Sequence, residues 1–246
     1  MTRGFPPTGR VALDIETISP NVGKNERPDF GNPDDFELLA VGLAYDGPRN
    51  PTVGSKRVLL RDDPSPAAEL DLLQRTVSAL RTYNPETLIT YSGEEFDLPI
   101  LLGRPIRAAD NPAGDAALGE LETALNGVEH DDLKYEAWET YGDYLTLEEL
   151  AIKEGLRPAE TRFEDFDHGM DLPSVRPSNS TKPTVQSKDI PGIGEVWLHA
   201  RSPVHDNIGP CNVDATRDLI EHYTLGDIEH LFSLADARPF NSNDIN

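Results

Sequence analysis

The sequence has few of the residues from which disulfide-linked, cysteine-metal or membrane-spanning proteins are built. Cys211 is the single cysteine among 246 residues, which excludes an internal disulfide and any metal site made of several cysteines. There is no run of about 18 apolar residues, so no membrane-spanning helix is expected. The opening residues, Met-Thr-Arg-Gly-Phe-Pro-Pro, lack the apolar stretch of a secretion signal. We therefore expect a cytoplasmic protein without a membrane partner.

Positive charge is also scarce. The chain carries 44 acidic residues against 22 lysines and arginines, a net charge of −22, and only 6 of the basic residues are lysine. Acidic residues occur in every segment, so they do not form one disordered tail. A uniformly acidic, lysine-poor surface is typical of halophilic proteins, because molar salt shortens the Debye length to about 3 Å and screens self-repulsion. The alternative is an ordinary acidic protein. In molar salt the negative charge is only a weak argument against a nucleic-acid partner.

The apolar pattern predicts an α/β fold. Helices are expected from Pro66 to Asn84, at about 94–102, 116–124, 134–141 and 145–154, and over 214–235. The order of strands and helices fits an antiparallel hairpin extended by α/β crossovers, which gives a mixed sheet flanked by helices. Five strands are expected, at residues 10–16, 37–46, 56–61, 87–91 and 127–133.

The segment of about 163–210 is rich in Pro, Gly and Ser and has few helix or strand signals. It is expected to be a long irregular insertion. No boundary divides the chain, so residues 1–246 are expected to form a single domain.

Three acidic motifs carry the chemistry. Asp14 and Glu16 are two apart on an expected strand, so their side chains share one face. Asp97 follows the glycine turn at Gly93 at the start of a helix. Tyr223 and Asp227 are four apart on a helix and share a face. Taken singly, each motif also has a structural explanation: solvated acids at a strand end, an acid favoured by a helix N-terminus, and a core tyrosine beside a surface acid.

Together the motifs supply four carboxylates and one phenol. Four converging carboxylates suit a pair of hard divalent cations, and two such ions about 4 Å apart can promote phosphodiester cleavage. The sequence therefore predicts a metal-dependent nuclease.

The same motifs resemble the ribonuclease-H-like DEDD exonuclease superfamily. The matching segments are Asp14-Ile15-Glu16-Thr17, Tyr91 to Pro99, and Tyr223-Thr224-Leu225-Gly226-Asp227. The resemblance is closest to the tyrosine subclass, which includes the proofreading domains of family B DNA polymerases and stand-alone prokaryotic proteins. It covers roughly residues 10–234, apart from 163–210. His130-Asp131-Asp132-Leu133 also resembles the acid-Leu segment on the fifth strand of this superfamily, which would place Asp132 near the site and not among the metal ligands.

The resemblance implies a ribonuclease-H-like fold and a 3′→5′ exonuclease that uses two Mg²⁺ or Mn²⁺ ions. Its nucleic-acid partner would be DNA or RNA, with single-stranded 3′ ends favoured. Asp14 would bridge both metals. Glu16 and Asp227 would complete the site of the water-activating metal, Tyr223 would orient the water, and Asp97 would hold the second metal.

Two positions depart from the simplest match. The second motif usually carries Asn where this chain has Ser92, which affects local geometry or substrate contacts more than metal binding. His222 lies five residues before Asp227, the spacing of the histidine subclass. Positions five apart on a helix diverge by about 140°, whereas positions four apart differ by about 40°, so Tyr223 is favoured. Gly226 lies mid-helix at a cost of about 1 kcal/mol, for which close approach of substrate or another element is one explanation.

Weaker candidates remain. His199 and His205 are interpreted as solvated loop histidines, with metal binding as the alternative. Gly192-Ile193-Gly194 is too short for a phosphate loop. Trp138 and Trp197 could stack on bases, although core packing is favoured for Trp138. Two other functions also remain open: a degenerate nuclease fold that binds or scaffolds, and another metal-dependent phosphoryl-transfer enzyme such as an endonuclease.

Overall fold

A five-stranded mixed sheet forms the centre of the molecule. The computed structural model describes residues 9–23, 25–30, 32–47, 55–108, 113–202 and 211–240. The strand order is β3-β2-β1-β4-β5, with β1 antiparallel to β2, β2 antiparallel to β3, and β1, β4 and β5 parallel. The mixed five-stranded sheet predicted from sequence is therefore confirmed. The strands are β1 (Arg10–Ile18), β2 (Glu37–Asp46), β3 (Lys56–Leu60), β4 (Thr87–Thr90) and β5 (Glu129–Asp132).

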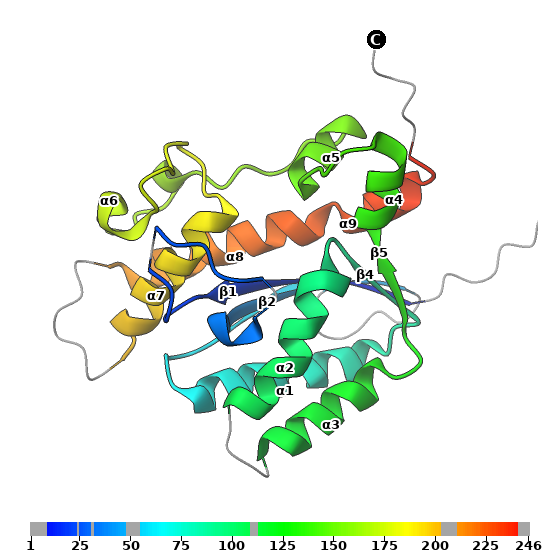
Figure 1. The fold of residues 1–246 in the computed structure, drawn as a ribbon, viewed down its shortest axis with the longest axis horizontal. Coiled ribbons are helices and arrows are strands. Elements are labelled where there is room, and N and C mark those ends of the chain that lie inside the picture. The colour runs from blue at the N-terminus through cyan, green and yellow to red at the C-terminus, as the bar shows by residue number, and fades with distance from the viewer. Residues whose placement is uncertain are drawn as a thin grey trace, which may run out of the picture.

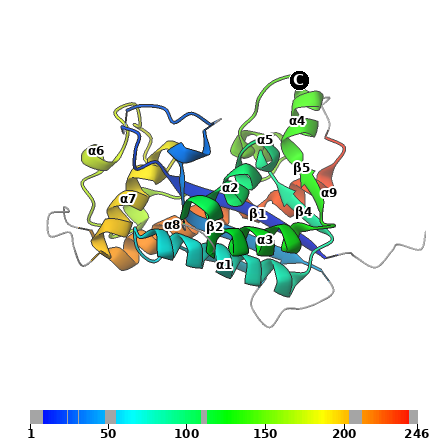
Figure 2. The same cartoon turned by 60° about the horizontal axis from the view of Figure 1, so that its bottom comes forward.

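Helices cover both faces of this sheet (Figure 1). One face packs against α1 (Pro66–Tyr83), α2 (Leu98–Ala108) and α3 (Ala113–Leu125). The long helix α8 (Val213–Glu229) crosses the other face beside β1 and β2, and Figure 2 shows α1 and α8 on opposite sides of the strands. The remaining helices are α4 (Leu133–Tyr141), α5 (Leu147–Lys153), α6 (Leu172–Val175), α7 (Ile190–Ala200) and α9 (Leu231–Ala237).

Strand β1 divides its side chains between the two faces. Val11, Leu13 and Ile15 are buried in the core shared with α1, α2 and α3. Because side chains alternate along a strand, the even-numbered residues face the opposite side, and there Ile18 joins the core that includes α7 and α8. Two acids on the even positions of β1 therefore point toward α8.

Helix α1 begins and ends as its sequence predicts. The Ser65 hydroxyl accepts a hydrogen bond from the amide of Ala68 at 3.2 Å, and Pro66 occupies the first turn, where a missing amide proton has little cost. Asn84 ends the helix in the left-handed region, with φ 47°.

The 163–210 segment is less irregular than predicted. It contains α7, an 11-residue helix that packs on β1 and α8, in addition to the short helix α6. The two glycines of Gly192-Ile193-Gly194 lie inside α7. A Cβ on Gly194 would lie 2.5 Å from Leu39 Cδ2, and one on Gly192 would lie 2.2 Å from the carbonyl oxygen of Val175. These glycines allow close helix packing, which explains a segment that looked like loop.

The predicted helix over 214–235 is two helices. Helix α8 ends at Glu229 and α9 starts at Leu231, with His230 between them. His199, predicted in a loop, lies in the last turn of α7, while His205 lies outside the described residues. Among the described residues, no helix is long and apolar enough to cross a membrane.

Candidate active site

Three acids from the two ends of the sequence meet on the α8 side of the sheet. Asp14 and Glu16 come from β1 and Asp227 comes from the last turns of α8. One carboxylate oxygen of each lies within 4.8 Å of the others. Oxygen donors at this separation can share one divalent cation, so the arrangement suits a hard metal ion.

A glycine on β2 lets α8 approach closely enough for this meeting. Gly42 pairs directly with Asp14 in the β1–β2 ladder. A Cβ on Gly42 would lie 2.7 Å from Thr224 Cγ2 and 3.2 Å from Ile228 Cγ2. The Thr224 hydroxyl in turn lies 3.4 Å from Glu16 Oε1. The lack of a side chain at residue 42 therefore helps to set the height of α8 above the acids of β1.

Asp97 lines the same cleft from a turn held by Asp132, but it lies outside the group of three acids whose oxygens are within 4.8 Å of one another. The chain leaves β4 through Ser92, in the left-handed region at φ 70°, and Gly93, whose Cβ would lie 2.2 Å from Thr90 Oγ1. The carboxylate of Asp132 accepts hydrogen bonds from the backbone amides of Ser92, at 2.9 Å, and Glu94, at 3.0 Å. Asp132 thus fixes the turn that carries Asp97, near the site as expected. Asn adopts left-handed backbone more readily than Ser, so the departure at residue 92 bears on the geometry of this turn.

The four carboxylates are poorly compensated. Asp97 is 3% exposed, and its Oδ2 atom has no hydrogen-bond partner within the part of the chain that the structure describes; Glu16 is 7% exposed. Among the described residues, none of the four carboxylates in the cluster forms a salt bridge. Burial, followed by the charge of neighbouring acids, raises the pKa of Asp14, Glu16 and Asp97 well above the ordinary range. An all-oxygen cluster with a buried unpartnered atom fits divalent cations.

Tyr223 belongs to this cluster and His222 does not. The Tyr223 hydroxyl hydrogen-bonds to Asp227, which lowers the Asp227 pKa, but burial is the larger effect and the pKa is raised to about 7. Burial and the nearby acids also raise the pKa of Tyr223, so its hydroxyl stays protonated at neutral pH. His222 instead lies 2.7 Å from Thr161 Oγ1 through its Nδ1 atom and contacts the ring of Phe166.

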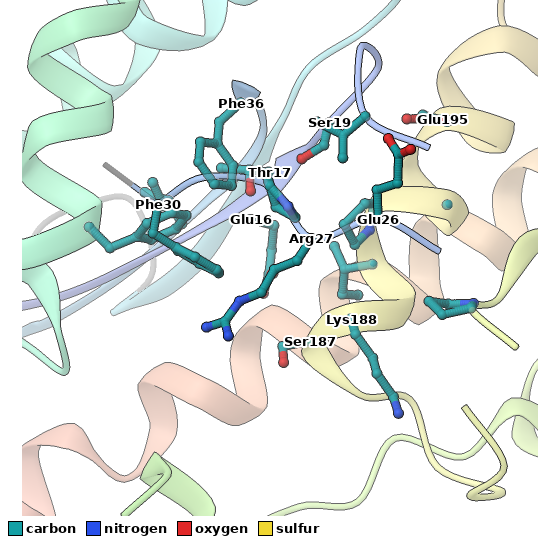
Figure 3. A pocket seen from close by; sticks show the side chains of 18 of the residues that line it. Glu16, Thr17, Ser19, Glu26, Arg27, Phe30, Phe36, Ser187, Lys188 and Glu195 are labelled. Carbon is teal, nitrogen blue, oxygen red and sulfur yellow. The ribbon is translucent and has the colours of Figure 1, made fainter. Parts of the chain in front are cut away.

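The acids lie in a cleft of about 950 Å³. One wall is the connection between β1 and β2, with Arg27 and Phe30; the other includes Lys188 and Glu195, from residues 187–195. Figure 3 shows Phe30 and Phe36 on one side of the cleft, Lys188 and Glu195 on the other, and Arg27 reaching between them. This volume is at the upper end of the range for small-ligand sites, so the cleft has room for an extended ligand.

Comparisons with known proteins agree with this fold. The family described as "DNA polymerase family B, exonuclease domain" matches residues 48–109, a range that contains Asp97. DNA polymerase 1 of Sulfolobus acidocaldarius is 29% identical over 116 residues, which are 44% of this chain and 13% of that protein. The chain resembles the exonuclease domain of family B DNA polymerases.

A solved structure extends this similarity to nearly the whole fold. The family B DNA polymerase from the hyperthermophilic archaeon Pyrobaculum calidifontis superposes with a TM-score of 0.56 at 17% identity, covering 95% of this chain and 25% of that chain. The ribonuclease-H-like fold predicted from sequence is thus confirmed. The exonuclease-like chain spans a quarter or less of the length of these relatives.

Several remaining candidates have structural roles or unexpected positions. Trp197 is 1% exposed, and its indole donates to the carbonyl of Val213. Trp138, for which core packing was favoured, is 45% exposed, so that prediction was wrong. A Cβ on Gly226 would make ordinary contact with Ala159, at 3.6 Å from its carbonyl oxygen, so close packing does not explain this glycine.

Proposed function

We propose that the chain is a metal-dependent 3′→5′ exonuclease that hydrolyses phosphodiester bonds of DNA or RNA with two Mg²⁺ or Mn²⁺ ions. The observation that carries the proposal is that Asp14, Glu16, Asp97 and Asp227 line one cleft, buried or half-buried, and form no salt bridge within the part of the chain that the structure describes. Similarity to an exonuclease domain supports the same reaction. Mutual repulsion of the acids is a cost that bound divalent cations would remove.

The resemblance to exonucleases suggests a role for each acid. Asp14 would contact both ions, while Glu16 and Asp227, whose carboxylates gather with that of Asp14, would complete the site of the first. Asp97, on its separate turn, would hold the second. The ions would supply a lowered pKa for water and charge stabilisation on the phosphate.

Tyr223 would orient the attacking water. Its hydroxyl is already hydrogen-bonded to Asp227, and its raised pKa keeps it neutral at the pH of the reaction. A neutral hydroxyl can donate one hydrogen bond and accept another, so Tyr223 would position the water without removing its proton.

The cleft and the charge of the chain favour a single strand in high salt. Arg27 and Lys188 line the cleft near the acids and would contact phosphates. The net charge of −22 opposes a polyanion at low ionic strength. We therefore propose that this is a halophilic, cytoplasmic enzyme that acts on single-stranded 3′ ends in concentrated KCl.

A cleavage assay tests the proposal. A 5′-labelled single strand incubated with Mn²⁺ in molar KCl should shorten stepwise from its 3′ end. A closed circular strand should stay intact, because a 3′→5′ exonuclease needs a free end. Cleavage of the circle would make the enzyme an endonuclease. An intact linear strand, with the protein folded and Mn²⁺ bound, would favour a binding module instead.

A further inference from the structure

Three aromatic side chains of α4 and the turn that follows it are exposed. Tyr135, Trp138 and Tyr144 are 37%, 45% and 62% exposed. The rings of Trp138 and Tyr144 stack with their centroids 5.4 Å apart and an interplanar angle of 17°. Clustered exposed aromatics on a protein surface usually mark a binding site.

Lys134 connects this aromatic pair to the cleft. Lys134 lines the cleft, and its Nζ atom lies 5.3 Å from the centre of the Tyr144 ring. The same ammonium group pairs with Glu95, another cleft residue, at 2.6 Å. Lys134 and Trp138 are four apart on α4, so they lie on one side of the helix. The aromatic surface is therefore continuous with the wall of the cleft.

A residue that lines the cleft helps to order the chain segment that carries Tyr144. The Tyr91 hydroxyl donates to the carbonyl of Leu145, and Tyr91 lines the cleft just after β4. Gly142 ends α4 in the left-handed region at φ 68°, and Thr146 forms a capping box with Glu149 at the start of α5. These contacts order both ends of the short segment that carries Tyr144, so little conformational entropy is lost when a ligand stacks on it.

We propose that Trp138 and Tyr144 form a stacking platform for the bases of a single-stranded nucleic acid that extends out of the cleft. Every base has a π-face, so such stacking tolerates any sequence. Nearby Glu94, Glu95 and Asp143 would repel phosphates, which favours a strand with its bases on the platform and its phosphates in solvent. The proposal rests on the proposed function in that the cleft holds the 3′ end.

Tryptophan fluorescence tests binding at the platform directly. The sequence has two tryptophans, and Trp197 is buried. In the Trp197→Phe variant, Trp138 is the single tryptophan, and excitation at a wavelength that tyrosine does not absorb reports on it alone. Titration with a 15-nucleotide oligothymidylate in Ca²⁺, which leaves the strand uncleaved, should quench this signal. Unchanged fluorescence at saturation, with binding confirmed by anisotropy of a labelled strand, would overturn the proposal.

Substrate length separates the platform from the reaction centre. Trp138→Ala should weaken binding of the 15-mer about tenfold, the loss expected for one base stack, and leave hydrolysis of a dinucleotide unchanged. Trp138→Phe should restore most of the affinity. The matched control is Ile106→Ala, which truncates an apolar side chain on α2 that is 51% exposed. It should change neither measurement.

The possible outcomes remain distinguishable. Equal losses on the 15-mer and the dinucleotide would place Trp138 in the reaction centre and overturn the proposal. Wild-type affinity in Trp138→Ala would also overturn it. If the wild-type protein cleaves neither substrate, the proposed function fails, while the fluorescence and affinity measurements still decide the platform.

Discussion

Two buried acids outside the candidate site are paired with arginines, whereas two buried acids inside it are not. Glu69, on α1, is 1% exposed and accepts two hydrogen bonds from Arg104 at 2.7 Å and one from the amide of Leu38 at 2.8 Å. Asp97 is 3% exposed, but one of its oxygens has no partner. Both positions are deep, so burial alone does not explain the difference.

The remaining buried acids repeat this contrast. Asp189 is fully buried and bonds to Arg176 at 3.1 Å and to the amide of Gln186 at 3.0 Å. Among the described residues, Glu16 has a single side-chain hydrogen-bond partner, the Thr224 hydroxyl at 3.4 Å. Glu69 and Asp189 each pair with an arginine side chain. Glu16 and Asp97 instead lie near other acids. Stability favours the first arrangement, so the second is best explained by an external cation.

The largest difference is expected when one site acid is neutralised. Asp14→Asn should reduce cleavage more than 10³-fold, because loss of a single transition-state donor already costs on the order of 10²–10³-fold. Without metal, the Asp14→Asn variant should be at least as stable as the metal-free wild type, because one of several buried negative charges has been removed. Cleavage assays and urea unfolding in EDTA measure both effects. A clearly less stable metal-free variant would show that the acid is compensated after all.

Breaking the buried Glu69–Arg104 pair should instead destabilise the protein. Arg104→Ala leaves Glu69 buried and unpaired, and should lower the free energy of unfolding by about 3–5 kcal/mol. Arg107→Ala, on the same helix, removes an exposed pair with Asp34 and should cost less than about 1 kcal/mol. Urea unfolding compares the two variants. Equal costs would mean that burial of the Glu69–Arg104 pair is not what matters.

The pH dependence of metal binding sharpens the comparison. Asp227 has its pKa raised to about 7, so the metal-free protein keeps a proton there that the unfolded chain would release. This contribution to stability is present at low pH and is lost as the pH rises through 7. Mn²⁺ must displace the proton below pH 7, so its affinity should fall about tenfold per pH unit for each proton displaced. Calorimetry at pH 6 and pH 8 measures the change; equal affinities would argue against a protonated cluster.

The smallest expected effect concerns the water-orienting hydroxyl. Tyr223→Phe should slow cleavage about tenfold, which corresponds to one hydrogen bond of roughly 1.4 kcal/mol, with Mn²⁺ affinity unchanged. His222→Ala should leave the rate near that of wild type, because His222 contacts Thr161 and not the acids. Rate and calorimetry together check both variants. If His222→Ala is the inactive one, the assignment to the tyrosine subclass is wrong.

Much of the architecture could be predicted because local patterns and tertiary structure agree. All five strands lie close to their predicted positions, and the acid spacing on β1 placed Asp14 and Glu16 on one face. Helix α7 was missed because Pro191, Gly192 and Gly194 weaken a helical signal. A glycine is needed at residue 194 because Leu39, which is distant in sequence, packs too closely to leave room for a side chain. A local sequence pattern cannot reveal such a contact.

Trp138 was misassigned for a related reason. Helix α4 is short and buries Leu133 and Ala137, so its apolar residues do not define one clear stripe. Whether an aromatic residue on such a helix is covered depends on what packs over it. The stacking of Trp138 on Tyr144, across the turn at Gly142, is visible only in three dimensions.

The hydrogen bond between Thr224 and Glu16 spans 208 residues of sequence. During synthesis, β1 leaves the ribosome long before α8, the helix that brings Asp227 to Asp14 and Glu16. Contacts this far apart along a chain form late in folding. The acids of β1 would therefore gain Asp227 as a neighbour only after α8 has been synthesised and has packed on the sheet, so a fragment that stops before Val213 would lack part of the site.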